Sequence, residues 1–196
     1  MSCDASPVVL VLASGRGERF RASGGTVHKL QALLGGRAVM QHTLDAVRAS
    51  GLRWHVEDAG HPGMGDSIAA AVRATRDAPG WLVLPADLPL VLPGTLRRIA
   101  DALTSAATDA AATAAQPVFQ GRPGHPVGFS AGCLPSLLAL RGPQGAAAVL
   151  RAQREAGRCI ELPVDDEGIA IDIDTLDDLA RAEAIWCARQ REAPAG

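Results

Sequence analysis

Tyrosine is absent from this 196-residue sequence, and aromatic residues make up only 3% of it. Proteins that bind single-stranded nucleic acid need aromatic rings on which bases can stack, so this function is disfavoured. An excess of positive charge is also missing, because the formal net charge is −2 and the isoelectric point is near 6.2. Binding along a phosphate backbone needs a basic surface. We therefore expect no nucleic-acid partner, and any phosphate chemistry must be local.

Cysteine is scarce, and its four occurrences (Cys3, Cys133, Cys159 and Cys187) are far apart. No pair has the Cys-x-x-Cys spacing that is typical of a zinc site. Four widely separated cysteines also do not suggest a disulfide framework. The sequence predicts scattered, mostly buried thiols.

Lysine is nearly missing, since Lys29 is the only lysine among 19 basic residues. A lysine carries a compact ammonium group on a thin stem, and it fits where the wider guanidinium group of arginine does not. Chance can also leave one lysine in a sequence that is strongly biased toward arginine. Composition alone leaves both interpretations open.

Long apolar runs are missing as well. The longest early run extends from Val8 to Ala13, far below the ~20 residues that a membrane-spanning helix needs. The N-terminal segment MSCDASP lacks the basic start and apolar stretch of a signal peptide. These features predict a cytoplasmic protein without a membrane partner.

Length and composition are typical of a soluble globular protein, so residues 1–196 are expected to form a single domain.

Strand and helix patterns alternate along the chain. Short apolar runs predict strands at residues 8–12, 52–57, 81–86, 126–130, 159–164 and 169–173, with a further strand ending near residue 119. Apolar residues at helical spacing predict helices at 39–50, 66–76, 93–103, 132–140 and 144–156, and a closing helix from 175. Asp66 is expected to cap the second helix, and Thr175 with Asp178 the last. The pattern predicts a three-layer α/β fold with a mostly parallel sheet.

In such sheets, ligands bind outside the carboxyl ends of the strands. This rule selects the loop from Ala13 to Lys29, which begins with the sequence LASGRGERF, and the turn from Ala86 to Pro89. Backbone N–H groups of a glycine-containing turn can bind phosphates, and Arg16 and Arg19 add positive charge. The loop lacks the Lys-Ser/Thr pair of a Walker A motif and the third glycine of a dinucleotide fingerprint.

Aspartates supply the candidate metal ligands. Asp87 follows a buried strand, where a carboxylate commonly holds Mg²⁺, although it could instead cap the loop. Asp172 and Asp174 alternate, so both side chains would face the same way if the segment were a strand. Asp174 could also cap the last helix.

Six segments occur in a fixed order along the chain: LASGRGERF, Lys29-Leu30, GMGDSI, LPADLP, GRPGHPVGF and DIDTLDDL. This ordered set, which covers about residues 8–185, resembles the nucleotidyltransferases of molybdenum cofactor maturation. Both cytidylyltransferases and guanylyltransferases of molybdopterin are in this family. The resemblance implies a Rossmann-like nucleotidyltransferase fold.

The resemblance also implies roles for individual residues. The catalytic residues would be Lys29, Asp87 and Arg16. The nucleotide would be bound by Leu12, Ala13, Ser14, Gly15, Gly17, Arg19, Gly65, Asp66 and Ser67. The metal would be held by Asp87 and Asp174, with Asp172 in support, and His125 would face the acceptor unless it only orders its loop.

The implied reaction is the Mg²⁺-dependent transfer of CMP from CTP to a phosphate of molybdopterin, with release of pyrophosphate. A molybdenum hydroxylase could receive the product. A GTP-dependent enzyme and another nucleotidyltransferase, such as one acting on sugar phosphates, remain as alternatives. A nucleotide- or cofactor-binding chaperone without catalytic activity is the alternative from another class.

Three departures from the family pattern bear on these alternatives. Ser14 stands where the cytidylyl enzymes usually have Ala and the guanylyl enzymes Gly, and its bulk predicts CTP rather than GTP. The segment between Gly51 and Gly63 is short, so one strand–helix element near residues 52–63 is expected to be missing. Pro143 and Ala147 replace an Asp and an Arg of the family, which affects the expected contacts to the acceptor.

Overall fold

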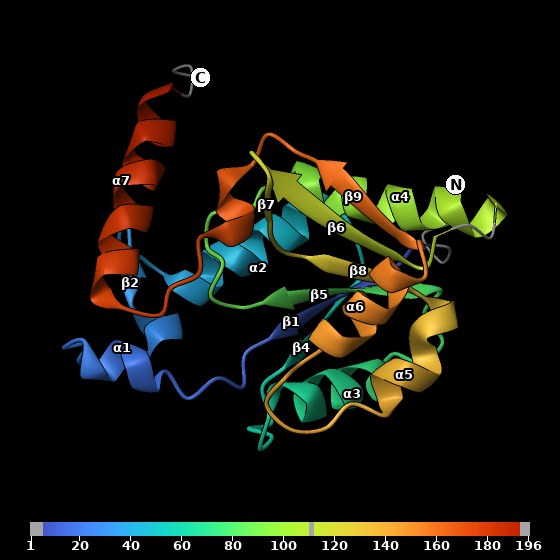
Figure 1. Ribbon diagram of the computed structural model, residues 1–196. Coiled ribbons are helices and arrows are strands. Elements are labelled where there is room, and N and C mark those ends of the chain that lie inside the picture. The colour runs from blue at the N-terminus through green and yellow to red at the C-terminus, as the bar shows by residue number, and fades with distance from the viewer. Residues whose placement is uncertain (1–5, 110–111, 193–196) are drawn as a thin grey trace.

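The centre of the computed structural model is a seven-stranded sheet with the order β4-β1-β5-β8-β6-β7, in which β9 pairs with β6 (Figure 1). Its strands are β1 (Val8–Leu12), β4 (Trp54–Glu57), β5 (Gly80–Pro85), β6 (Ala114–Phe119), β7 (Arg122–Pro123), β8 (Val127–Ser130) and β9 (Cys159–Pro163). β1 is parallel to β4 and β5, and β6 is parallel to β9. β8 is antiparallel to both β5 and β6. The mostly parallel sheet predicted from the sequence is confirmed.

The structure describes residues 6–109 and 112–192. Residues 1–5 lie outside the described residues. They include Cys3 and most of the N-terminal segment MSCDASP, for which the sequence predicted no signal peptide. Within the described ranges, no helix is long and apolar enough to cross a membrane. Cys133, Cys159 and Cys187 are free thiols, but of these three only Cys133 is buried, so the prediction of mostly buried thiols is wrong for the described cysteines.

β1 shows why the sheet is covered on both faces. All five residues of its sequence VVLVL are buried. Since successive side chains of a strand point to opposite faces, Val9 and Val11 enter one apolar cluster, whereas Val8, Leu10 and Leu12 enter the other. A strand buried on both faces belongs in the interior of a sheet, and β1 lies between β4 and β5.

Helices form a layer on each face of the sheet (Figure 1). One layer contains α2 (Val39–Ser50), α4 (Pro93–Asp109) and α7 (Leu176–Glu192). The other contains α3 (Met64–Ala74), α5 (Leu134–Leu138) and α6 (Ala147–Glu155). The shorter elements are α1 (Glu18–Ala22), η2 (Lys29–Gln31), η3 (Ala131–Cys133), η4 (Glu167–Ala170) and the hairpin of β2 (Leu33–Leu34) and β3 (Arg37–Ala38). The three-layer arrangement matches the prediction.

Local sequence determines where several helices begin and end. α2 ends at Gly51, whose φ of 72° lies in the left-handed region that glycine adopts without strain. α4 begins at Pro93, which suits the first turn of a helix. The predicted capping box of α7 is present, because the N–H group of Asp178 donates to Thr175 Oγ1 at 3.2 Å and the Thr175 hydroxyl donates to the Asp178 carboxylate at 2.7 Å.

Some local predictions are wrong. α3 begins at Met64 with Gly63 as its cap residue, so Asp66 lies in the first turn and is not the N-cap. Residues 169–173 do not form a strand, because the Asp166 carboxylate accepts a hydrogen bond from the Gly168 N–H group and begins η4 instead. The predicted helix at 132–140 is divided into η3 and α5.

The short segment between Gly51 and Gly63 contains β4 alone. β4 pairs with β1 and lies at the edge of the sheet. The chain then enters α3 directly, with no further strand or helix in this segment of the described chain.

Candidate functional site

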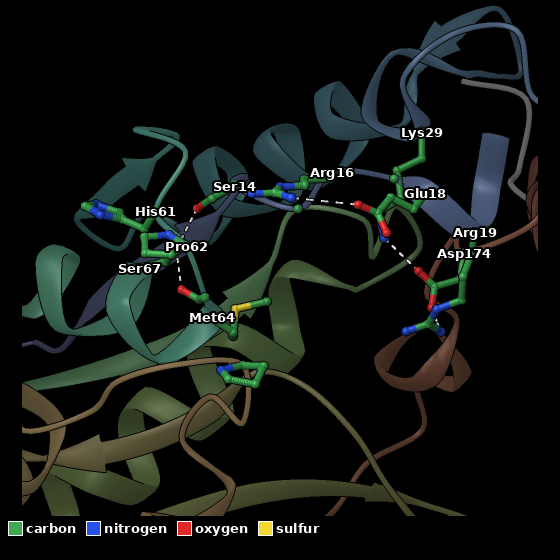
Figure 2. Close-up of a pocket in the computed structure, with 14 residues that line it drawn as sticks. Ser14, Arg16, Glu18, Arg19, Lys29, His61, Pro62, Met64, Ser67 and Asp174 are labelled. Carbon is green, nitrogen blue, oxygen red and sulfur yellow. Dashed lines mark hydrogen bonds and ion pairs between the residues drawn. The ribbon is translucent and has the colours of Figure 1, made fainter. Parts of the chain in front are cut away.

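A cavity of about 390 Å³ opens at the carboxyl end of β1, under the loop that was predicted to bind phosphates. We call it the loop cavity. Figure 2 shows Ser14, Ser67 and Met64 on one side of it and Lys29, Arg19 and Asp174 on the other. Its remaining lining residues are Gly15, Arg16, Gly17, Glu18, His61, Pro62, Gly63 and Pro143.

The loop itself combines backbone donors with positive charge. Gly17 has a φ of 65° and precedes α1, a short helix that the sequence did not predict. Within the part of the chain that the structure describes, the N–H groups of residues 14–17 have no hydrogen-bond partner. Arg16 is exposed, and its Nη1 atom lies 3.9 Å from Glu18 Oε1. Because an exposed ion pair of this length is weak, the guanidinium group is free to contact a ligand. These features suit an anionic ligand.

His28 fixes the path of this loop, and sequence reasoning missed it. One ring nitrogen, Nε2, lies 2.8 Å from the carbonyl oxygen of Gly15. The other, Nδ1, accepts a hydrogen bond from the N–H group of Leu30 at 3.3 Å. His28 therefore connects the loop to η2, which carries Lys29. Its position one residue before Lys29 is the signal that could have identified it.

Lys29 lies at the centre of the site. Its Nζ atom is 2.5 Å from Asp87 Oδ2 and 2.7 Å from Asp174 Oδ1, and its side chain is only 11% exposed. Burial by itself lowers the pKa of Lys29, but the two carboxylates outweigh this effect and the net pKa is raised. The only lysine of the chain is thus a fully charged group between two aspartates that are far apart in sequence.

Asp174 binds basic side chains and does not cap α7. Its carboxylate forms ion pairs with Lys29 and Arg19. Burial raises its pKa, but these two cations outweigh the burial and the net pKa is lowered. Since Thr175 and Asp178 cap the helix, the alternative in which Asp174 serves as the cap is wrong.

Asp172 lies near the same cluster, although residues 172–174 are not a strand as the alternation argument assumed. Burial, together with the negative charges of Asp87 and Asp174, raises the pKa of Asp172. Asp172, Asp174 and Asp87 line a second cavity of about 450 Å³, the acidic cavity. An irregular segment therefore brings Asp172 and Asp174 to the same cavity as Asp87.

The atom Asp87 Oδ1 is buried and has no hydrogen-bond partner among residues 6–109 and 112–192. A buried acceptor without a partner is unfavourable, so a ligand or ion would satisfy it. Among the described residues, no group of three or more His, Cys, Asp or Glu side chains could hold a metal ion. A cation that Asp87 Oδ1 contacts would therefore have to be one that takes few protein oxygens and completes its shell with ligand oxygens and water, as Mg²⁺ does.

The wall opposite Lys29 is formed by α3. Ser14 Oγ and Ser67 Oγ are 2.8 Å apart and form a hydrogen bond on this side of the loop cavity. Gly65 and Asp66 do not line this cavity, because they face the segment 141–142. The N–H group of Gly65 donates to the Gly142 carbonyl, and the Asp66 carboxylate accepts from the Gly142 N–H group at 2.9 Å.

The start of α3 is tightly packed against that segment. A Cβ atom at Gly65 would lie 2.9 Å from the backbone of Arg141, too close for a real contact. Gly65 and Asp66 therefore hold the wall in place, and of the three residues Gly65, Asp66 and Ser67 it is Ser67 that lines the loop cavity. Leu12 and Ala13 also lie outside the loop cavity, and Ala13 donates its N–H group to the Glu57 carbonyl.

A third cavity, of about 380 Å³, is mainly apolar. It lies between α3, β8 and the start of α6, and Leu12 and His125 are among its lining residues. His125 also lines the acidic cavity, and Met64 lines all three cavities. The three cavities are therefore neighbouring parts of one cleft at the carboxyl edge of the sheet.

Comparison with known proteins gives a family match and several similar solved structures. The family model of the MobA-like NTP transferase domain matches residues 45–157, more than half of the chain. No curated protein sequence matches the chain.

Solved structures match nearly the whole chain. Rv0371c from Mycobacterium tuberculosis H37Rv is 24% identical, with a TM-score of 0.75 over 94% of this chain and 100% of that chain. The nucleotidyl transferase Mth528 from Methanothermobacter thermautotrophicus is 21% identical, with a TM-score of 0.73 over 94% and 99%.

The molybdopterin-guanine dinucleotide biosynthesis protein A from Archaeoglobus fulgidus is 21% identical, with a TM-score of 0.59 over 93% and 99%. Another structure of Rv0371c is a complex with manganese. At these identities the structures establish a shared Rossmann-like fold.

Proposed function

The chain belongs to the family of MobA-like NTP transferase domains and is a nucleotidyltransferase, and on that premise we propose that it transfers CMP from CTP to a phosphate group of molybdopterin. Pyrophosphate is the second product, and Mg²⁺ is the proposed metal. Family membership favours an enzyme over the alternative of a chaperone without catalytic activity.

The observation that carries the proposal is the position of Lys29. Its ammonium group is buried between Asp87 and Asp174, directly beside the loop cavity with its free N–H groups. Two polyanions that react with each other need concentrated positive charge and fixed donors. Lys29, Arg16 and Arg19 supply the charge, and the backbone of residues 14–17 supplies the donors. No side chain has to act as a nucleophile.

Asp87 and Asp174 are the residues that would hold Mg²⁺. The unpartnered Asp87 Oδ1 supports this assignment, and the manganese complex of the similar protein Rv0371c supports a divalent cation. When bound, the metal would neutralise negative charge on the phosphate oxygens. Asp172 lines the same cavity and adds negative charge near that position.

The protein's own part in the transfer is positioning. The loop holds the triphosphate, and Lys29 moves its charge from the two carboxylates toward the phosphates as these bind. A phosphate oxygen of the acceptor then attacks the α-phosphorus, the bond to the bridging oxygen of the β-phosphate breaks, and pyrophosphate leaves with that electron pair. In-line geometry follows if the acceptor enters from the acidic cavity and the triphosphate from the loop cavity.

The hydrogen-bonded pair of Ser14 and Ser67 supports the choice of CTP. Two hydroxyl groups 2.8 Å apart narrow the end of the loop cavity opposite Lys29. Less room favours a pyrimidine over the larger purine of GTP. The proposed acceptor site is the part of the cleft at His125, and a molybdenum hydroxylase is the proposed recipient of the product.

The decisive experiment measures pyrophosphate release from the purified chain with molybdopterin, Mg²⁺ and either CTP or GTP. We expect release that requires molybdopterin and Mg²⁺ and that is faster with CTP. Asp87→Asn keeps the shape of this partly buried side chain but removes its charge, and it should reduce turnover below about a tenth of wild type while the fold is retained. Faster release with GTP would overturn the nucleotide assignment, and unchanged turnover in Asp87→Asn would overturn the metal assignment.

A further inference from the structure

The turn that carries Asp87 is held by backbone contacts on two sides. The N–H group of Ala86 donates to the carbonyl of Leu12, the last residue of β1, at 3.0 Å. The carbonyl of Asp87 accepts a hydrogen bond from the N–H group of Ile173, also at 3.0 Å. One contact connects the turn to the strand that precedes the loop cavity, and the other connects it to the segment that leads to Asp174.

A third contact comes from a side chain outside the cleft. The hydroxyl of Thr43, within α2, donates to the carbonyl oxygen of Ala86 at 2.9 Å. Both residues are buried, with Thr43 0% and Ala86 1% exposed. Thr43 lines none of the three cavities. It therefore acts on the site through the backbone of Ala86 and not by contact with a ligand.

This hydrogen bond leaves the helix that carries it. The hydroxyl of a helical threonine often bonds to the carbonyl four residues earlier in its own helix, as Thr104 of α4 does with Ala100 at 2.9 Å. Thr43 instead reaches a turn 43 positions away in sequence. Since a buried carbonyl without a donor is unfavourable, the bond holds the Ala86 peptide in one orientation.

The orientation of the Ala86 peptide determines where the next side chain lies. The Asp87 side chain is only 14% exposed, and its Oδ2 atom lies 2.5 Å from Lys29 Nζ. An aspartate has only two side-chain torsions, so its carboxylate follows the backbone closely. A shift of the turn would lengthen the contact with Lys29 and would also move the Oδ1 atom of Asp87. A misplacement of about 1 Å in an active site can cost about a hundredfold in rate.

We propose that Thr43 is a positioning residue for Asp87: its hydroxyl fixes the turn of Ala86 and Asp87 from α2 and thereby sets the distance between the Asp87 carboxylate and Lys29. The consequence for metal binding rests on the proposed function, in which Asp87 holds Mg²⁺. The consequence for the contact with Lys29 is independent of that function.

Lys29 reports on this contact directly, because it is the only lysine of the chain. Isotope-labelled lysine therefore gives a single set of side-chain NMR signals in the full chain without ligand. Thr43→Val keeps the shape of the side chain and removes the hydroxyl, so the Lys29 signals should move. Thr43→Ser keeps the hydroxyl, so the signals should stay near their wild-type positions. Unmoved signals in Thr43→Val would overturn the proposal.

Two matched variants separate positioning from general destabilisation. Val47→Ala removes a buried side chain one turn further along α2, and Thr104→Val removes a hydroxyl that bonds within α4. Val47→Ala should lower the melting temperature, because it leaves a cavity in the core. Neither control should move the Lys29 signals. An equal movement in Val47→Ala and Thr43→Val would overturn the proposal, since any weakening of α2 would then be enough.

The metal site is tested in the pyrophosphate assay, through the Mg²⁺ concentration that gives half of the maximal rate. We expect this concentration to rise about tenfold in Thr43→Val and to return to the wild-type value in Thr43→Ser. A loss of folded protein would lower the rate but leave this concentration unchanged, so the measurement isolates positioning. An unchanged Mg²⁺ requirement in Thr43→Val would overturn the role of Thr43 at the metal site.

If Thr43→Val does not fold, Thr43→Cys takes its place, because a thiol is a weaker donor than a hydroxyl. Unmoved Lys29 signals in folded Thr43→Cys would then overturn the proposal. Failure of the proposed function is a separate result. If Asp87→Asn keeps full turnover, the metal role of Asp87 fails, whereas movement of the Lys29 signals in Thr43→Val still supports the positioning of Asp87 by Thr43.

Discussion

At the scale of single residues, the site is dominated by one compact cation between two carboxylates. Burying Lys29 is costly, and the cost is offset only because Asp87 and Asp174 lie within hydrogen-bond distance of its ammonium group. The same contacts keep both carboxylates away from any metal. Metal binding and the movement of Lys29 toward the phosphates are therefore coupled in our proposal.

This coupling leads to opposite expectations for metal affinity and turnover in Lys29→Met. Without the ammonium group, Asp87 loses its basic partner and Asp174 keeps only Arg19, so Mn²⁺ should bind more tightly in the absence of nucleotide. Turnover should fall about a hundredfold, because the triphosphate loses its buried cation. Calorimetric titration with Mn²⁺ and the pyrophosphate assay measure the two effects.

Lys29→Arg is the matched control, since it keeps the charge but changes its shape. The guanidinium fork needs more room than the space between the carboxylates offers, so this variant should not recover normal turnover. Wild-type kinetics in Lys29→Arg would show that the solitary lysine reflects composition alone.

Burial lowers the pKa of His125, and this leads to an expectation for the pH dependence of stability. Its pKa is lowered in the folded chain, so below the ordinary value near 6.5 the unfolded chain binds a proton that the folded chain does not. Stability should therefore fall as the pH drops from about 7 to about 5, by at most about 1.4 kcal/mol per pH unit from this residue.

Urea denaturation of the wild type and of His125→Asn across this range isolates the contribution, because the other histidines are common to both proteins. The free energy of unfolding should depend less steeply on pH in the variant. Parallel curves for the two proteins would show that His125 is protonated equally in the folded and unfolded states.

At the scale of elements, one buried carboxylate joins three helices. Asp166 Oδ2 accepts hydrogen bonds from the Leu92 N–H group at 2.9 Å and the Thr95 hydroxyl at 2.7 Å, both at the start of α4. Asp166 Oδ1 accepts from the Gly168 N–H group of η4 and lies 3.6 Å from Arg189 of α7. The segment that leads to Asp172 and Asp174 is thereby attached to the body of the protein.

Asp166→Ala should lower the free energy of unfolding by about 3 kcal/mol, because it leaves several buried donors without a partner. The neighbouring Asp165 is exposed, so Asp165→Ala is a suitable control and should change stability by less than about 0.5 kcal/mol. Guanidinium denaturation of both variants gives the comparison. Similar stabilities for the two variants would contradict the joining role of Asp166.

The start of α7 allows capping and metal binding to be separated by two adjacent substitutions. Thr175→Ala removes the side chain that accepts from the Asp178 N–H group and should cost about 1 kcal/mol of stability with little loss of turnover. Asp174→Asn keeps a side chain of the same shape but removes a charge that contacts Lys29, so turnover should fall sharply. Thermal denaturation and the pyrophosphate assay on both variants check this pair, and normal activity in Asp174→Asn would contradict its role.

Most elements could be predicted because their signals are local. The all-apolar β1, the glycine that ends α2 and the capping box of α7 each lie within a few neighbouring residues. The predicted strand at 169–173 was wrong because its apolar pattern is outweighed by Asp166, whose side chain begins η4 and binds the start of α4. Such a competition between elements cannot be seen in a short window of sequence.

The position of the site could also be predicted in outline, because parallel strands bring their carboxyl ends to one edge. The contact between Lys29 and Asp174 could not, since it joins residues 145 positions apart through a segment without regular structure. The bond between His28 and Gly15 has no sequence pattern of its own either. The family resemblance indicated the residue types of the site, and only the structure places them in three dimensions.

At the scale of the whole molecule, the cleft separates charge from apolar surface although the net charge of the chain is only −2. Charged side chains of both signs line the loop cavity and the acidic cavity, and the mainly apolar third cavity has no charged wall residue among the described side chains. This order matches a substrate pair with a polyanionic middle and an uncharged end.

A nucleotide in this cleft would join parts of the chain that are far apart in sequence, including the loop after β1, α3 and the segment at Asp174. A ligand that binds only the folded state stabilises it by mass action, by about 2.7 kcal/mol at a hundred times its dissociation constant. For a protein of this size, that corresponds to a rise in melting temperature of about 5–10 °C. We expect this rise for CTP with Mg²⁺ and a smaller one for GTP at the same concentration.

The control for this thermal-shift experiment is Ser14→Gly, which removes the hydroxyl that bonds to Ser67 and widens the end of the loop cavity. In this variant, the rise in melting temperature caused by GTP should approach the rise caused by CTP. The Ser14 side chain is expected to favour binding of the smaller base by about 1–3 kcal/mol, and Ser14→Gly removes this side chain. Chelation of the metal with EDTA should remove most of the shift in both proteins, since the triphosphate would then face the carboxylates without a cation between them. An equal rise in melting temperature for CTP with and without EDTA would mean that the nucleotide binds without a metal. A larger rise for GTP than for CTP in the wild type would mean that the enzyme uses the purine nucleotide.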